Sequence, residues 1–284
     1  MIKKGDRTML RRYILFLKKR PLLTAAFGIV YALVCIHFLP SDTSFQMLLV
    51  RTLLCGAMIF FLYQISGEKT LLAYYNSTGY VIKVALGFWI FAFLGGSLGM
   101  IGHLIADTPY WDNMALHALT VFLMFVFVGL FEEMAFRALI NDAIIYRFRD
   151  KKYVFVLGAV CCSLVFGAAH VIGADLSTPL AWAQAAGKTI STGVFGLVLL
   201  ILYWKTRNIW ACGIVHGVYD FLLSMSMCVF QVDQEGISYV MSDDKALPVV
   251  IAYGFMTVLE LVILLFVWRK VGRKIDYQQI RETW

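Results

Sequence analysis

The sequence contains little charge for its length. Only 15% of its 284 residues are Asp, Glu, Lys or Arg, whereas 61% are hydrophobic and the mean hydropathy is +0.76. A soluble domain needs a polar surface that this composition does not supply. We therefore predict an all-α fold, a polytopic membrane helical bundle.

Several signatures of other protein classes are missing. No H-E-x-x-H zinc motif occurs in the chain. The six cysteines all fall within apolar stretches without metal-type spacing, so we expect neither a disulfide framework nor a structural zinc site. We find no internal repeat or long linker, and we expect one bundle that needs no cofactor and no metal.

Three parts of the chain differ in composition. Residues 1–20 are basic, and their charged residues interrupt any apolar stretch long enough for the core of a cleavable signal peptide. We therefore expect a cytoplasmic N-terminal segment. Residues 21–268 form the predicted bundle, and 269–284 form a basic tail. A bilayer core of about 30 Å needs about 20 apolar residues per helix. We predict eight spans, near 21–40, 46–65, 81–105, 114–140, 153–172, 183–204, 208–231 and 247–268.

The distribution of charge predicts the orientation. Most of the 25 Lys and Arg residues lie in the alternate loops that share a side with the N-terminus. Loops rich in these residues stay in the cytoplasm, so both termini are predicted to be cytoplasmic. This topology accounts for the net charge of +7, and we expect no nucleic-acid binding.

Ionisable residues within the predicted spans are few, and a charge in hydrocarbon costs at least a few kcal/mol. We interpret Arg51 and three histidines near the outer ends as interfacial residues. Glu260 is either a buried structural group or a group that supports a site. The complete set is Arg51, Glu132, Glu133, Arg137, His170, His216, Asp220 and Glu260, with His37, His103 and His117 near the ends.

Helical spacing arranges the remaining residues in pairs. Glu133 and Arg137 are four apart, so they share a helix face and can form an ion pair, whereas Glu132 points elsewhere. The same spacing relates Phe166 to His170, and His216 to Asp220.

These pairs suit hydrolysis. A Glu and a His that converge in a dry cavity can activate water and move its proton, and a second His can stabilise an oxyanion. We expect Arg137, Asn141 and Asp142 to line a route from this centre to the cytoplasm.

The motifs "EEMAFR", "FGAAH" and "HGVYD" occur in this order on separate spans. Together they resemble the motif set of the CPBP family, which comprises type II CAAX prenyl endopeptidases and bacteriocin-processing enzymes and is also described as glutamic intramembrane proteases. The resemblance covers about Leu130 to Leu223, within a predicted core of 114–231.

The resemblance implies a role for each matched residue. Glu132 would activate water with help from His170, and His216 with Asp220 would form the oxyanion site. The remaining matched residues would support the geometry; they are Glu133, Arg137 and Phe166.

Asp220 departs from the pattern of the prenyl-protein enzymes, which have Asn at this position. An ionised Asp cannot donate a hydrogen bond to an oxyanion. Asp220 must therefore be protonated, or it must orient His216 instead.

Our leading hypothesis is a bacterial intramembrane endopeptidase of the plasma membrane. Its partners would be the lipid bilayer and a small peptide or membrane-protein precursor, and the sequence predicts no oligomeric state. One alternative is a non-proteolytic protein of the same fold that confers bacteriocin self-immunity or scaffolds a partner. A second is an ion-coupled or proton-coupled transporter, against which the missing repeat counts. A third is a zinc site made from Glu132, His170, His216 and Asp220.

Overall fold

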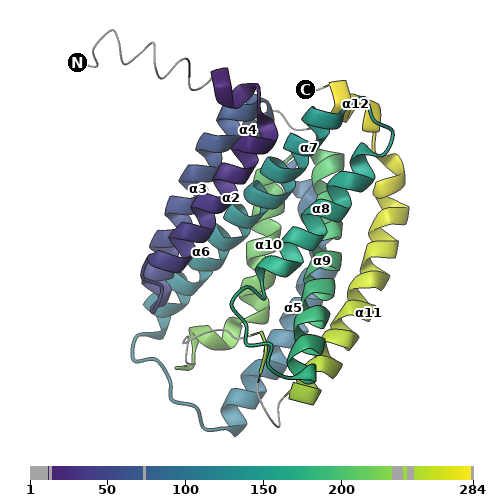
Figure 1. Ribbon diagram of the computed structural model, residues 1–284. Helices are drawn as coiled ribbons and strands as arrows, with labels where there is room; N and C mark the ends of the chain where they lie inside the picture. The colour runs from purple at the N-terminus through teal and green to yellow at the C-terminus, as the bar shows by residue number, and fades with distance from the viewer. Residues whose placement is uncertain (1–11, 13–14, 73–74, 232–238, 242–245, 283–284) are drawn as a thin grey trace, which may run out of the picture.

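The computed structural model describes residues 12, 15–72, 75–231, 239–241 and 246–282 (Figure 1). Within these residues the chain is almost entirely helical, and the β-type pairing consists of a single bridge between Tyr110 and Phe230. The all-α prediction is confirmed.

The helices run along one common direction in Figure 1. Short segments of two other helix types lie between the α-helices. They are one π-helix (η1) and two 3-10 turns (η2 and η4). In chain order the elements are α2 Pro21–Phe38, α3 Ser44–Ser66, α4 Lys69–Leu72, α5 Thr78–Ile105, α6 Met114–Glu132, η1 Glu133–Ile140, α7 Asn141–Phe148, α8 Val154–Ala169, α9 Pro179–Thr206, α10 Ile209–Leu223, η2 Met225–Cys228, α11 Ala246–Lys270, η4 Gly272–Lys274 and α12 Tyr277–Glu282.

Six helical stretches of the described chain are long and apolar enough to cross a bilayer, and two further apolar helices are shorter. The chain is therefore a multi-pass membrane protein. The two short helices are α8 and α10, where the sequence predicted spans of 153–172 and 208–231. Helix α8 ends earlier because the chain turns after Ala169, with Gly173 at a positive φ of 83°. Helix α10 ends at Leu223 and gives way to a 3-10 turn.

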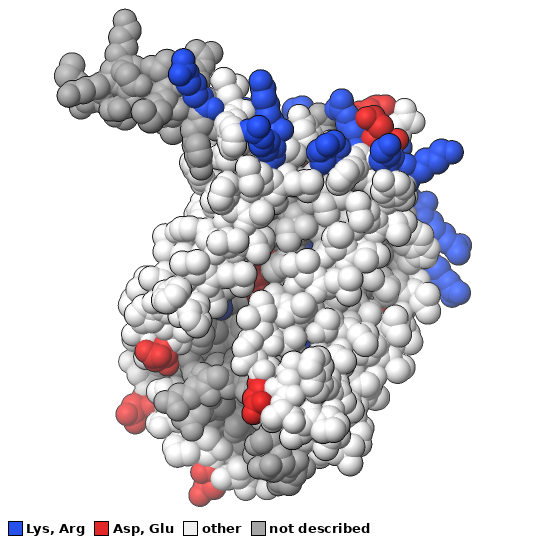
Figure 2. All heavy atoms as spheres, in the orientation of Figure 1, with Lys and Arg blue, Asp and Glu red and all other residues white. Residues whose placement is uncertain are grey.

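Charge divides the two ends of the bundle. Helix α2 begins and α12 ends at the same end, where α7 also lies (Figure 1). Lys and Arg side chains gather at this end in Figure 2, and on the face shown several acidic side chains lie at the opposite end. This separation is the one that the positive-inside rule requires of a protein with both termini in the cytoplasm.

The core of the bundle forms where α6 crosses α10. Helix α3 packs on α6, α5 packs on α10, and α9 packs on α8 and α11. The crossing of α6 and α10 is close because it is made by glycines. A methyl group added at Gly217 would lie 2.5 Å from the carbonyl oxygen of Phe125, and one at Gly129 would collide with the backbone of Gly213 and Gly217. Small residues at these positions therefore allow the two helices to approach closely.

The π-helix was not predicted from the sequence. It begins at Glu133, directly after α6, and its residues from Glu133 to Leu139 are buried. The wider turn changes the direction in which successive side chains point, and π segments within α-helices are frequent at functional sites. It therefore places the two adjacent glutamates at a junction between two helical geometries.

Candidate functional site

Two adjacent glutamates differ in their surroundings. Glu133 is fully buried, and its Oε1 atom lies 3.3 Å from NH1 of Arg137. The same oxygen accepts a hydrogen bond of 2.9 Å from Nδ1 of His216. The side chain of Glu132 retains 16% of its exposure. The predicted division of the pair is therefore present, with Glu133 held on two sides and Glu132 open.

His216 on α10 connects the two glutamates to Asp220. Its Nε2 atom lies 3.7 Å from Oε2 of Glu132 and 3.3 Å from Oδ2 of Asp220, one turn further along α10. The imidazole itself is buried, whereas the Asp220 side chain is 24% exposed. We name Glu132, Glu133, Arg137, His216 and Asp220 the Glu132 cluster.

The hydrogen bond from His216 to Glu133 fixes the state of one ring nitrogen. A carboxylate oxygen only accepts, so Nδ1 carries the proton of this bond. The other nitrogen faces oxygens of Glu132 and Asp220, and lone pairs on both sides would repel each other. A proton on Nε2 or on one of these carboxyl groups would remove this repulsion. The sequence did not predict the contact between Glu133 and His216.

His170 follows the last residue of α8. Its Nδ1 atom lies 2.8 Å from the carbonyl oxygen of Phe166, so Nδ1 donates this bond and leaves Nε2 as an acceptor when the ring is neutral. The described residues show no hydrogen bond between His170 and Glu132, although the two are close enough to interact electrostatically.

Phe166 is the aromatic centre of the site. Its buried ring lies 4.9 Å from the ring of His170 and 5.9 Å from the ring of His216, measured between centroids. The guanidinium carbon of Arg137 lies 4.0 Å from the centroid of the Phe166 ring, a cation–π arrangement. The structure thus brings all seven predicted site residues into one region, on α6, η1, α8 and α10.

Charged atoms lie within a hollow on the face shown in Figure 2. The exposed fractions of Glu132 and Asp220 show that the cluster is accessible and not sealed inside the bundle. In the part of the chain that the structure describes, no three His, Cys, Asp or Glu side chains converge as metal ligands would.

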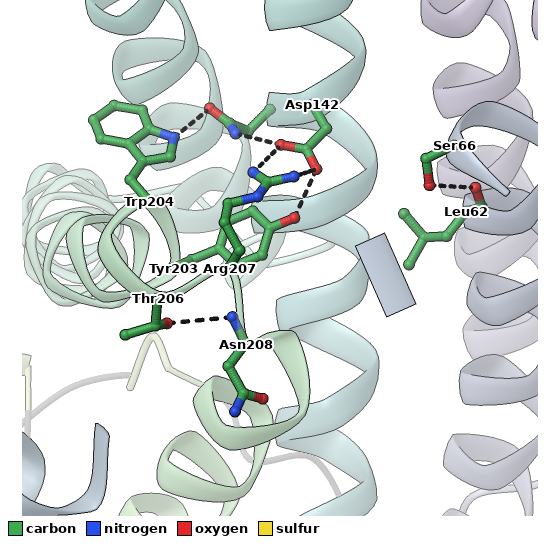
Figure 3. Close-up of polar contacts among 9 residues, drawn as sticks. Leu62, Ser66, Asp142, Tyr203, Trp204, Thr206, Arg207 and Asn208 are labelled. Carbon is green, nitrogen blue, oxygen red and sulfur yellow. Dashed lines mark hydrogen bonds and ion pairs between the residues drawn. The ribbon is translucent and has the colours of Figure 1, made fainter. Parts of the chain in front are cut away.

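The route to the basic end that the sequence predicted is wrong. Arg137, Asn141 and Asp142 are all buried and line no channel. Asp142 accepts hydrogen bonds of 2.9 and 2.7 Å from the guanidinium of Arg207 and one of 2.6 Å from the hydroxyl of Tyr203 (Figure 3).

Two amide and indole contacts complete this group. Nδ2 of Asn141 donates to Oδ1 of Asp142 over 3.0 Å, and the indole nitrogen of Trp204 donates to Oδ1 of Asn141 over 3.2 Å. We name Asn141, Asp142, Tyr203, Trp204 and Arg207 the Asp142 network. Arg207 directly follows α9 and has a positive φ of 53°. Its planar fork of donors matches the two oxygens of Asp142.

Glu260 on α11, whose role the sequence left open, is buried and accepts a hydrogen bond of 2.7 Å from Ser191 on α9. Lys188 also lies on α9, close enough to Glu260, Asp220 and Glu132 to interact with their charges. A role for Lys188 could not be predicted from the sequence, because the acidic side chains near it belong to other helices.

Comparison with known proteins gives one finding. Residues 113–222 match the family described as type II CAAX prenyl endopeptidase Rce1-like. No curated protein and no solved structure shows a significant match. The matched segment contains every residue of the Glu132 cluster together with Phe166 and His170.

Proposed function

On the match over residues 113–222, which supports the CPBP family of CAAX proteases, we propose that this chain is an intramembrane endopeptidase that uses a water activated by Glu132. Its substrate is a small peptide or a membrane-associated precursor. The observation that carries this proposal is the pair of accessible carboxyl groups, Glu132 and Asp220, on either side of an imidazole that Glu133 holds in place.

The first step is the attack of water on the scissile carbonyl carbon. Glu132 takes a proton from the water, and the oxygen forms a bond to the carbon as the carbonyl π-electrons move onto its oxygen. Nε2 of His170 is a free acceptor because Nδ1 donates to Phe166, so His170 can orient the same water. Positioned acid–base groups of this kind contribute about 10²–10⁴-fold to a rate.

The second step is stabilisation and collapse of the tetrahedral oxyanion. The proton between His216 and Asp220 is a hydrogen-bond donor for the negative oxygen, and Glu133 keeps the ring from rotating away. The carbonyl then re-forms, the carbon–nitrogen bond breaks, and Glu132 returns its proton to the leaving amine.

The test is a comparison of peptides in membranes that contain the native protein or Glu132→Gln. The substitution removes the base and preserves the side-chain shape, so we expect at least one cleavage product to disappear while the protein level stays the same. The purified variant should unfold within about 0.5 kcal/mol of the native protein, as expected for a partly exposed site. Unchanged products would contradict the proposal.

The same variant distinguishes a protease from a non-proteolytic scaffold or immunity protein. A scaffold does not need a base, so its biological effect should persist in Glu132→Gln. Metal analysis of purified, chelator-treated protein with the same activity measurement tests the zinc alternative.

A further inference from the structure

Two basic side chains beside the Glu132 cluster form no ion pair or hydrogen bond with any described residue. They are Arg51 on α3 and Lys188 on α9. Arg51, interpreted from the sequence as an interfacial residue, has its guanidinium carbon 5.8 Å from the centroid of the Phe131 ring. Its Nε and NH1 atoms are buried without a hydrogen-bond partner in the described chain.

Lys188 approaches the site from a different helix. Its ammonium lies 4.0 Å from the centroid of the Tyr239 ring, and that ring lies 5.7 Å from the ring of His170. The charges of Asp220 and Glu132 act on Lys188 without forming an ion pair with it. Arg51 is likewise close enough to interact with Glu132 and Tyr239.

The aromatic partner of Lys188 is itself held in place. The hydroxyl of Tyr253 donates to the carbonyl oxygen of Tyr239 over 2.7 Å. Gln184 exchanges two hydrogen bonds with the backbone of Met241, of 2.8 and 2.7 Å. Helices α9 and α11 therefore fix the segment 239–241, and the cation–π contact keeps Lys188 in position beside the site.

Buried donors without partners are rare, because each one loses its bonds to water without replacement. An arginine is the side chain best suited to bind a carboxylate, since its planar fork matches the two oxygens. We propose that Arg51 and Lys188 together bind a carboxylate group of the peptide substrate and so place the scissile bond over Glu132. This assignment rests on the proposed function.

The surrounding charges favour a monoanion. Glu132, Asp220 and Glu260 all interact with Lys188, so a doubly charged phosphate here would face three acidic side chains. A carboxylate brings one negative charge to two cations. The group comes either from the C-terminus of the peptide or from an acidic side chain.

Binding of three short peptides to the purified protein in detergent tests the proposal. They are N-acetyl-trileucine as the free acid, its C-terminal amide, and the amide with its last leucine replaced by glutamate. We expect the free acid, the glutamate amide or both to bind at least about tenfold more tightly than the leucine amide, which corresponds to about 1.4 kcal/mol. Which acidic peptide binds more tightly identifies the source of the carboxylate.

Variants assign the effect to the two cations. Arg51→Gln and Lys188→Gln should each reduce the preference for the acidic peptide, Arg51→Lys should retain part of it, and Lys83→Gln, at an exposed position on α5, should leave it unchanged. Thermal unfolding confirms that each variant is folded. Equal binding of acid and amide by the native protein, or a preference that survives in the double variant, overturns the proposal. These are binding measurements, so they are separate from the loss of cleavage products that tests Glu132.

Discussion

The Asp142 network and the Glu132 cluster both lie inside the described part of this bundle, and they differ in how completely their members are paired. In the Asp142 network both oxygens of Asp142 accept two hydrogen bonds each, from Arg207 and either Asn141 or Tyr203, at 2.6–3.0 Å. In the Glu132 cluster the contacts of His216 Nε2 are longer, at 3.3 and 3.7 Å, and two carboxyl groups remain partly exposed.

The difference agrees with a structural role for the Asp142 network and with the proposed chemical role of the Glu132 cluster. A buried charge is tolerated when its partners satisfy it, and removal of one partner is then costly. Burial alone would lower the pKa of Arg207, but the Asp142 carboxylate more than compensates and holds that pKa above its ordinary value. Groups that bind and release protons cannot have every polar atom occupied by a fixed partner. In the Glu132 cluster, the carboxyl groups of Glu132 and Asp220 are not fully occupied in this way.

The largest loss of folding stability should follow from a substitution in the Asp142 network. Asp142→Asn removes the charge opposite buried Arg207, so we expect a loss of about 3–5 kcal/mol of folding free energy. Yield and thermal unfolding in detergent measure it. Asp150→Asn, at an exposed position nearby, is the control and should change little. An Asp142→Asn protein as stable as the control would remove the distinction between the two groups.

A smaller loss of stability is expected from Glu133→Gln. This change leaves Arg137 without its ion pair, although the amide oxygen can still accept the proton of His216, so we expect about 2 kcal/mol. Comparison with Glu132→Gln, which should lose activity but not stability, tests the division between the adjacent glutamates. A stable Glu133→Gln protein together with an active Glu132→Gln protein would reverse the assignment.

The smallest change in stability should come from Asp220→Asn, which is the same type of substitution as Asp142→Asn. We expect activity within about tenfold of the native protein and little change in stability, because an amide can donate to an oxyanion in place of a protonated carboxyl group. Activity of the native protein should fall at alkaline pH as that proton is lost, and the variant should lack this fall. A drop of about 10²-fold or more across the whole pH range would instead show that Asp220 orients His216.

The parts of the site within one helix could be predicted from the sequence, since a spacing of four residues sets them. The contacts Glu133–Arg137, His216–Asp220 and Phe166–His170 are all of this kind. The fold class followed from the apolar stretches in the same way.

Contacts between helices could not be predicted because they depend on how the helices cross. The bond from His216 to Glu133 requires the close approach of α6 and α10, for which Gly129 and Gly217 were the available signal. The pairing of Asp142 with Arg207, 65 residues later, had no such signal, so Asp142 was interpreted as lining a channel. The π-helix left no recognisable pattern either.

The early end of α8 has a consequence for the membrane itself. Its 16 residues extend about 24 Å, less than the bilayer core of about 30 Å. The irregular chain after Ala169, beginning with His170, therefore lies at a depth where its polar backbone cannot face lipid tails. Either other parts of the protein cover this backbone, or the bilayer thins there or admits water. In the second case, the short helix gives water access to the residues that, in the proposed reaction, consume it.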